Sequence, residues 1–401
     1  MNFIERYVKF AEPLTEAPRQ FHYYMAYMLL SCAVNRRAWY SGAGSFDISP
    51  NLWFILIGPS SITKKSTMLN IALRHILAHT NIEFEKYPQG GSQENFLETL
   101  SEKPMGIIAH SEFMSFMDWV NRDYNAGLVS ILSDIFDQPP LVTRSVGTRG
   151  KRTDYRIEKP FVNIATVTNI EWMNDCLKET KIIGGFIPRF NLILSNDDEK
   201  SIPETPEPNE QLRKELIWEL ENINTSTFGK MTYDPQAKKA NNEWYNEFKD
   251  KFIRGAPANL VPCLDRRRSD LHKFAMLNCI MRNEGKSCNV MNLEDFSKAV
   301  DTIANITNFT TQVICDKITY NQYQSNRQKI IEMVKKIAGT NGGCPHSVLL
   351  RVSKIKGKDL RDHMEDLVED GTITTEQDKS GARIKILYHI NEKDGQDENN
   401  S

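Results

Sequence analysis

The feature that most constrains the fold is a short apolar run ending in a polar turn, within NLWFILIGPSSITKKST at residues 51–67. Residues 52–57 are almost all apolar, which is typical of a strand buried on both faces of a parallel sheet. Gly58 and Pro59 end that strand, and residues 68–78 then carry apolar side chains at helical spacing. A strand, a tight turn and a helix in this order indicate a phosphate-binding loop, in which backbone N–H groups, a lysine and a hydroxyl meet an anion and its Mg²⁺.

The usual pattern G-x-x-x-x-G-K-[ST] is matched only in part, so it can be aligned with this loop in two registers. Counted from Gly58, the pattern makes Lys64 the phosphate lysine and puts Thr63 where a glycine belongs. We prefer a loop longer by one residue, in which Lys65 holds the phosphate and Ser66 ligates Mg²⁺. A missing glycine makes a turn with positive φ costlier. The residues then expected to bind nucleotide are Gly58, Pro59, Ser60, Ser61, Lys64, Lys65, Ser66 and Thr67. A surface turn with two lysines is the alternative.

Polar residues follow two further apolar runs. Residues 107–110 lead into Ser111 and Glu112. An acid at the carboxyl end of a strand beside a phosphate loop holds Mg²⁺ through water or polarises the attacking water, so Glu112 is a candidate catalytic residue and metal ligand. Two acids usually stand there, and here Ser111 replaces the first; an ordinary surface glutamate is the alternative. Residues 161–167 form another buried run, and Asn169 after it can orient water against a γ-phosphate.

Two arginine positions are candidates for contacts with nucleotide. Arg189 lies between a glycine turn at residues 184–185 and the last apolar run, which suits a finger that reaches the phosphates of a neighbouring subunit. An arginine cluster at residues 266–268 opens a helical pattern at residues 271–281. One of its members, Arg268 in our assignment, would contact nucleotide from a lid domain, and a solvated helix end is the alternative.

A basic turn separates two stretches with strand propensity, residues 141–146 and 154–157. The cations in and around this turn are Arg144, Arg149, Lys151, Arg152 and Arg156. A basic hairpin tip is suited to contact a phosphate backbone, so we expect it to bind DNA. Because runs of charge usually face water, a solvated hairpin is the alternative.

The sequence changes character twice after residue 200. Residues 201–209, SIPETPEPN, form a proline-rich acidic connector and the clearest domain boundary, and residues 211–314 are polar and helical. From residue 326 onward, three helical patterns and two strands indicate a winged helix-turn-helix, followed by a polar tail for which we expect disorder. Arg351 and three lysines cluster at the start of its third helix, the end that enters a major groove. These lysines are Lys354, Lys356 and Lys358.

Composition limits the remaining possibilities. The chain has 401 residues, enough for two or three domains, and its net charge of −2 excludes a global basic field. Its seven cysteines have no C-x-x-C spacing, which indicates reduced thiols and neither a disulfide framework nor a zinc site. We find no signal-peptide core and no stretch apolar enough to span a bilayer. We therefore expect a cytoplasmic protein without membrane contact.

With these elements in order, the chain resembles a family of phosphate-loop ATPases from phages, plasmids and integrated mobile elements, often described as primase-associated or replicative helicase domains. The resemblance is carried by GPSSITKKST, IIAHSEF, the basic hairpin leading into FVNIATVTN, and GGFIPRF. Their order is similar to that in AAA+ ATPases with a pre-sensor-1 hairpin, which include the minichromosome-maintenance helicases. By this resemblance the hairpin lines a central DNA pore. Glu112 is the second-motif acid, Asn169 the first sensor, Arg189 the finger acting in trans, and an arginine among residues 266–268 the second sensor.

The predicted fold is an α/β phosphate-loop NTPase core of AAA+ type, a parallel sheet with helices on both faces. The expected parts are a helical N-terminal segment (1–50), the ATPase core (51–200), a helical lid (210–320), a winged helix (326–391) and a tail (392–401). The predicted function is an ATP- and Mg²⁺-dependent DNA helicase or translocase, acting as a hexameric ring in replication of a phage or mobile element, with a primase as a candidate partner. A nucleotide-switched DNA-binding initiator or regulator, and a nucleotide-binding scaffold for host proteins, are the alternatives.

Overall fold

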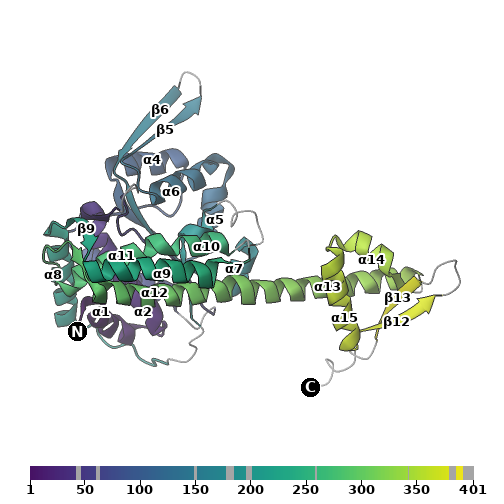
Figure 1. Cartoon of the computed structure of the whole chain (residues 1–401). Coiled ribbons are helices and arrows are strands. Elements are labelled where there is room, and N and C mark those ends of the chain that lie inside the picture. Colours follow the sequence, from purple (N-terminus) through teal and green to yellow (C-terminus); the bar gives the residue numbers. More distant parts are fainter. Residues whose placement is uncertain are drawn as a thin grey trace. The chain divides into compact units, whose positions relative to one another are not determined.

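The computed structural model describes residues 1–41, 47–59, 64–148, 151–177, 185–195, 201–257, 260–341, 343–378 and 385–391 (Figure 1). The chain forms two compact units, Met1–Ile314 and Cys315–Ser401, and each is described by itself. The helices of the first unit are α1 Phe3–Ala11, α2 Arg19–Val34, α3 Lys65–Asn70, α4 Gln93–Glu102, α5 Phe113–Asn121, α6 Leu128–Phe136, α7 Ile170–Leu177, α8 Glu210–Thr225, α9 Pro235–Phe248, α10 Val261–Asp265, α11 Arg267–Arg282 and α12 Leu293–Thr311.

A five-stranded parallel sheet forms the framework of the first unit, in the order β3-β4-β7-β2-β8. Its strands are β2 Trp53–Ile57, β3 Glu85–Lys86, β4 Met105–His110, β7 Phe161–Thr168 and β8 Asn191–Leu194. Strand β7 lies between β4 and β2 and is parallel to both. The carboxyl ends of β2, β7 and β4 therefore meet at one edge of the sheet, and the polar segments predicted to bind nucleotide leave from that edge.

Helices cover both faces of this sheet, as the sequence predicts. Every residue of β2, β7 and β8 is buried, which explains why these strands read as continuous apolar runs. On one face, Phe54 and Val167 share a hydrophobic core with residues of α2 and α11. On the other face, Trp53 packs against Phe136 at the end of α6 and against Phe190, with ring centroids 4.9 and 5.0 Å apart.

The predicted basic hairpin is present. Strands β5 Leu141–Thr148 and β6 Lys151–Glu158 pair antiparallel and project from the body of the first unit (Figure 1). At its base, Val142 and Ile157 lie opposite each other and are buried. The hairpin is therefore anchored at its base, and its polar part extends into solvent.

Residues 210–311 are not wholly helical, which corrects the sequence-based expectation. A small parallel sheet, β1-β9-β10, joins β1 Ala38–Tyr40 to β9 Gly229–Tyr233 and β10 Val290–Met291. After β1 the chain turns back and makes one antiparallel bridge, between Tyr40 and Ile48, and residues 42–46 lie outside the described part. Strands of two to five residues have too few positions to show a period-2 pattern. They tie the N-terminal segment to the region predicted as a lid.

The second unit contains the helices and strands predicted for residues 326–391, with a longer first helix. Its elements are α13 Ile318–Asn341, β11 Cys344–Pro345, α14 His346–Ser353, α15 Gly357–Glu369, β12 Ile373–Asp378 and β13 Lys385–Ile390. Strand β13 pairs antiparallel with β11 and β12. Ile330, Leu349, Leu360 and Leu367 belong to a separate small core. The predicted tail, residues 392–401, lies outside the described residues. Over the described residues of the chain, no helix is both long and apolar enough to cross a membrane.

Candidate nucleotide and DNA sites

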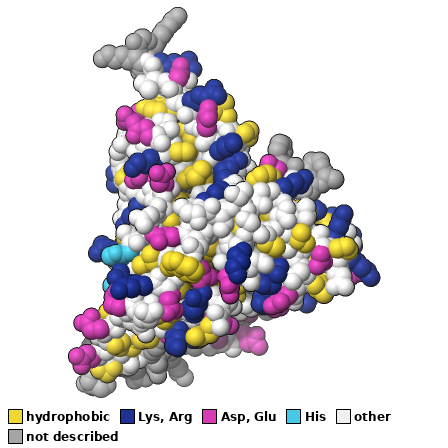
Figure 2. Space-filling view, turned by 90° about the vertical axis from the view of Figure 1, so that its left-hand side faces the viewer, with side chains coloured by type: hydrophobic (Ala, Val, Ile, Leu, Met, Phe, Trp, Pro, Cys, Tyr) yellow, Lys and Arg dark blue, Asp and Glu magenta, His cyan; other side chains and the backbone are white. Residues whose placement is uncertain are grey.

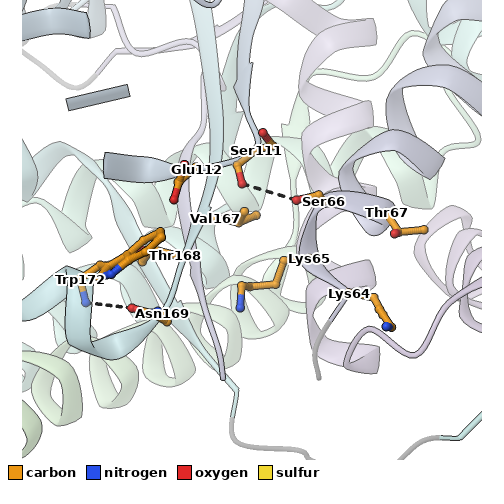
Figure 3. A pocket seen from close by; sticks show the side chains of 10 residues that line it. All are labelled: Lys64, Lys65, Ser66, Thr67, Ser111, Glu112, Val167, Thr168, Asn169 and Trp172. Atoms are coloured by element: carbon orange, nitrogen blue, oxygen red, sulfur yellow. Dashed lines mark hydrogen bonds between the residues drawn. The ribbon is translucent and has the colours of Figure 1, made fainter. Parts of the chain in front are cut away.

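A cavity of about 490 Å³ lies at the carboxyl edge of the parallel sheet (Figure 3). It is lined by Lys64, Lys65, Ser66, Thr67, Ser111, Glu112, Val167, Thr168, Asn169 and Trp172. These residues come from the segments that follow β2, β4 and β7, together with the end of β7. Because the three strands are adjacent and parallel, segments far apart in the sequence meet here. The structure thus brings together Lys65, Ser66, Glu112 and Asn169.

The backbone before α3 supports the longer register of the phosphate loop. Lys64 has a φ of +36° and immediately precedes α3, so it takes the left-handed conformation that glycine adopts without cost. It occupies the position of the glycine that precedes the lysine in the usual pattern. The Nζ of Lys65 donates to the carbonyl oxygens of Gly58 and Pro59, at 2.8 and 2.6 Å. Burial lowers the pKa of Lys65, and the negative charge of Glu171 opposes that shift.

The two described ends of the loop contact residues outside it. The Nζ of Lys64 lies 3.9 Å from a carboxylate oxygen of Glu16, an ion pair from the N-terminal segment. The N–H of Gly58 donates to the carbonyl oxygen of Thr168 at 3.2 Å, which joins the start of the loop to the end of β7. Thr67 lines the cavity. The predicted ligands Ser60 and Ser61 lie outside the described residues.

The two predicted metal ligands lie on the cavity wall. The hydroxyl of Ser66 donates to the carbonyl oxygen of Ser111 at 3.5 Å, and the carboxylate of Glu112 accepts from the Ser115 hydroxyl at 2.8 Å. At phosphate sites, Mg²⁺ takes one or two protein oxygens and completes its shell with phosphate and water oxygens. The Ser66 hydroxyl and the Glu112 carboxylate fit that donor set. Within the described residues, no group of three or more His, Cys, Asp or Glu side chains could hold a metal by itself.

Asn169 lies where β7 leads into α7, at the cavity. Its Oδ1 accepts from the backbone N–H of Trp172 at 2.8 Å, a bond that caps the first turn of α7 (Figure 3). This contact fixes the orientation of the amide. Trp172 is 43% exposed and forms part of the same wall.

Arg189 does not line the cavity, and its guanidinium is engaged within the chain. Its Nη2 donates to the carboxylate of Asp137 at 2.7 Å, and Arg266 reaches the other oxygen of that carboxylate at 3.4 Å. Both guanidinium groups lie over the ring of Phe136, 5.7 and 5.5 Å from its centroid, and the ammonium of Lys273 lies 4.1 Å from it. The contact of Arg189 with a neighbouring subunit stays a prediction.

The three arginines of the 266–268 cluster have different surroundings. Arg267 is fully buried; it donates to the side chain of Asn191 on β8 and pairs with Asp270 at 3.4 Å. Arg268 is exposed and lies over the ring of Tyr245, with 4.2 Å from its guanidinium carbon to the ring centroid. Arg268 does not line the cavity, so its predicted role in nucleotide binding stays a prediction.

The described cations of the hairpin are paired with acids. The ion pairs are Arg144 with Asp134, Arg152 with Asp154 at 3.2 Å, and Arg156 with Glu158 at 3.1 Å. Figure 2 shows basic and acidic side chains next to one another along the hairpin. Pairs this exposed contribute little to stability, so a phosphate backbone can compete for the cations. Arg149 and the side chain of Lys151 lie outside what the structure describes.

The predicted basic cluster of the second unit extends from the end of α14 to the start of α15. Lys354, Lys356 and Lys358 are exposed there, as is Arg351 at the end of α14. The remaining exposed surface of α15 carries mainly carboxylates. These acids are Asp359, Asp362, Glu365, Asp366 and Glu369. Since carboxylates repel phosphates, only the beginning of α15 and the residues just before it present a basic surface suited to a phosphate backbone.

Sequence reasoning missed Ser115, Trp172 and Asp137 as residues that contact or position the candidate groups. Ser115 follows Glu112 by three residues at the start of α5, and Trp172 follows Asn169 by three at the start of α7. That spacing, typical of helix N-termini, would have indicated both. No sequence signal joins Asp137 to Arg189, because they lie on separate elements that meet only in the fold.

Comparison with known proteins leaves the family open. No protein-family model matches the sequence, and no curated protein matches it. The fold is similar to a solved structure, a full-length MCM homolog from Methanopyrus kandleri, with 15% sequence identity and a TM-score of 0.43. The similarity covers 77% of this chain and 61% of that one, so this chain spans about three fifths of its length. A likeness of this extent does not establish a family or an activity.

Proposed function

We propose that this chain binds ATP in the cavity after β2, hydrolyses it with Mg²⁺, and uses the energy to move along or open DNA. The observation that carries the proposal is the convergence of Lys65, Ser66 and Glu112 on one cavity wall, with Asn169 beside them. Phosphoryl transfer needs a cation for the phosphates, an oxygen for the metal, and groups that hold and polarise the attacking water. These four side chains are of those types.

Each side chain has a role in this scheme. Lys65 exchanges its hydrogen bonds to the carbonyl oxygens of Gly58 and Pro59 for bonds to phosphate oxygens. Burial disfavours the charged form of its ammonium, and the negative phosphate stabilises that form. Mg²⁺ held by Ser66, and through water by Glu112, would neutralise charge that develops on the phosphates. Glu112, oriented by its bond from the Ser115 hydroxyl, takes a proton from the attacking water. Asn169 offers its amide to the terminal phosphate.

We assign single-stranded DNA to the hairpin and duplex DNA to the start of α15. The hairpin belongs to the same unit as the cavity and carries five basic against two acidic residues between positions 141 and 158. The candidate contacts are Arg144, Arg149, Lys151 and Arg152 on the hairpin, and Lys354, Lys356 and Lys358 at α15. Contacts of this kind are made to the phosphate backbone, so they predict binding without base specificity.

The remaining parts of the proposal rest on the resemblance of the sequence segments. We propose a ring of identical chains, a hexamer, in which Arg189 completes the site of the adjacent chain and Arg268 acts as the second sensor. The setting would be replication of a phage or mobile element in the cytoplasm, with a primase as a candidate partner.

A nucleotide-switched initiator or regulator is the second candidate. It is favoured by the engagement of Arg189 with Asp137 and of Lys65 with its own loop, contacts of a resting state. ATP turnover with and without single-stranded DNA, measured beside the oligomeric state by light scattering, separates the two. A motor is expected to form rings whose turnover DNA stimulates, with Lys65→Ala inactive. Nucleotide-dependent duplex binding without stimulated turnover would favour the regulator.

A further inference from the structure

We infer that the hydroxyl of Thr168 holds the attacking water beside Glu112, which makes Thr168, next to Asn169, a second polar group at the end of β7 that takes part in the reaction. The inference rests on the proposed ATP hydrolysis and adds a residue to it. Thr168 is the last residue of β7 and lines the cavity between the phosphate loop and the candidate acid.

The first observation is a buried hydroxyl without a partner. Thr168 is 3% exposed, and its Oγ1 has no hydrogen-bond partner among the residues that the structure describes. Buried polar atoms are nearly always hydrogen-bonded, so an exception calls for a physical reason. The orphan alone does not mark a site, because Thr166 on the same strand is also buried and unpartnered. Of these two threonines, only Thr168 lies on the cavity wall.

The second observation is the strand register. Thr168 pairs with Ile57, the last residue before the phosphate loop, so it is level with the start of that loop. On its other side, Thr166 pairs with His110 in the parallel β4–β7 ladder. Thr168 is two residues after Thr166, and Glu112 is two residues after His110. Both Thr168 and Glu112 line the cavity wall. Side chains two residues apart on a strand share one face. Thr168 therefore stands between the loop that binds the phosphates and the acid that takes the proton.

The third observation is how the neighbouring amide is used. The Oδ1 of Asn169 accepts from the backbone N–H of Trp172, so this oxygen is engaged at the start of α7. An attacking water needs acceptors for both of its hydrogens, so that a lone pair on its oxygen faces phosphorus. Glu112 accepts one hydrogen. The hydroxyl of Thr168 accepts the other and can still donate its own hydrogen to a phosphate oxygen.

The step balances as a hydrolysis. The water oxygen forms a bond to the terminal phosphorus, and the bond from that phosphorus to the bridging oxygen breaks, with its electron pair leaving on the diphosphate. One proton of the water passes to the Glu112 carboxylate. Thr168 is unchanged chemically and contributes orientation, for which a misplacement of about 1 Å costs about 10²-fold in rate.

The test compares three variants of the full chain by ATP affinity and by the rate of a single turnover. Thr168→Val keeps the shape of the side chain and removes the hydroxyl, whereas Thr168→Ser keeps the hydroxyl. Thr166→Val is the control, because Thr166 lies two residues earlier on the same face of β7. We expect Thr168→Val to bind ATP as the wild type does and to hydrolyse it about 10²-fold more slowly. Thr168→Ser should keep most of the rate, and Thr166→Val should keep all of it.

Thermal unfolding accompanies these measurements. Because a methyl group replaces an unpartnered buried hydroxyl, Thr168→Val is expected to melt no lower than the wild type, which separates a lost contact from misfolding. An unchanged turnover rate in Thr168→Val would overturn the inference while leaving the ATPase proposal intact. Equal losses in both valine variants would also overturn it. A wild-type chain that binds ATP and never hydrolyses it would overturn the proposed function itself.

Discussion

Arg189 and Asp137 form an ion pair of 2.7 Å that ties the arginine after the glycine turn to the residue after α6. The arginine side chain is 11% exposed and the aspartate 54%. Asp137 also pairs with Arg266, so one carboxylate holds two arginines from different parts of the chain. An arginine that serves a neighbouring subunit must first leave this partner. By holding Arg189, the pair would slow catalysis in trans, and we call it a candidate brake.

Removing the brake should accelerate turnover in the assembled protein. We expect Asp137→Asn to raise the ATPase rate by up to about five-fold, since an ion pair whose carboxylate is half-exposed is worth about 1 kcal/mol or less. Arg189→Ala should bind ATP normally and lose about 10³-fold in rate, by analogy with other arginine fingers. Turnover as a function of protein concentration measures both, because a group acting in trans works only in the assembly.

Asp134→Asn is the matched control for the brake. Asp134 is similarly exposed and pairs with Arg144 on the hairpin, away from Arg189. It should leave turnover without DNA unchanged. If Asp137→Asn slows turnover as Arg189→Ala does, Asp137 positions the arginine and does not restrain it. Partial recovery on mixing Arg189→Ala with Lys65→Ala chains would independently place Arg189 in trans.

That the candidate nucleotide-binding residues meet at one cavity followed from the sequence, because it depends on local signals. Buried parallel strands appear in the sequence as apolar runs, and the polar residues that follow them mark the carboxyl edge of the sheet. Because β2, β7 and β4 are neighbours in the sheet, Lys65, Glu112 and Asn169 meet at that edge. The side-chain contacts around that site could not be predicted from the sequence. Arg267 stands beside Arg268 in the sequence, yet it is fully buried against Asn191 because that side of α11 faces the sheet. Which residue of a basic cluster faces inward depends on helix packing.

The register of the phosphate loop gives a second prediction. Lys65→Ala should abolish nucleotide binding, whereas Lys64→Gly should retain it. Lys64 carries the positive φ and pairs at long range with Glu16, so a glycine there relieves strain of about 1 kcal/mol and loses a half-exposed ion pair worth less. Because Trp172 lies on the cavity wall, its fluorescence should change during an ATP titration. In Trp172→Phe that signal should disappear.

One further variant, and one opposite outcome, delimit this prediction. Lys64→Ala keeps no side chain for Glu16 and must still adopt a positive φ, so it should weaken binding more than Lys64→Gly does. Loss of binding in Lys64→Gly with retention in Lys65→Ala would assign the phosphate to Lys64, and the shorter register would be correct.

The buried ammonium of Lys273 predicts how stability depends on pH. Burial lowers its pKa from 10.5 to about 8, and Asp270 at 3.6 Å only partly opposes that shift. Between pH 8 and 10.5 the unfolded chain holds a proton there that the folded chain has released. Stability conferred at this site therefore rises with pH across that window, and below it the full cost of the buried charge remains.

Lys273→Met should remove this dependence. Asp270 keeps its pairing with Arg267 in the variant, so no carboxylate is left alone. We expect the variant to be more stable than the wild type near pH 7, by up to about 3 kcal/mol given about 1.4 kcal/mol per pKa unit, and the difference to shrink by pH 10. Melting temperatures of both proteins across that range measure it. Parallel curves would show that Lys273 does not titrate there.

The last prediction concerns which basic element holds which DNA. Replacing Arg149, Lys151 and Arg152 with alanine should abolish stimulation of turnover by single strands. It should also flatten the salt dependence of single-strand binding by up to about 2 units of log–log slope, since each lost phosphate contact removes about 0.7. Replacing Lys354, Lys356 and Lys358 should instead weaken duplex binding and spare the stimulation.

The acidic surface of α15 sharpens this comparison. If the length of the helix lay in a major groove, Glu365 and Asp366 would face phosphates, and changing them to Gln and Asn would strengthen duplex binding several-fold. If only the first turn touches DNA, these changes have little effect because screening weakens their field beyond about 10 Å. A triple alanine variant at Lys214, Lys230 and Lys238, exposed lysines elsewhere, controls for net charge. Should the α15 lysines carry the single-strand response and the hairpin none of it, the nucleotide-switched initiator becomes the better description, because the element that binds DNA would then belong to the second unit and the candidate ATP site to the first.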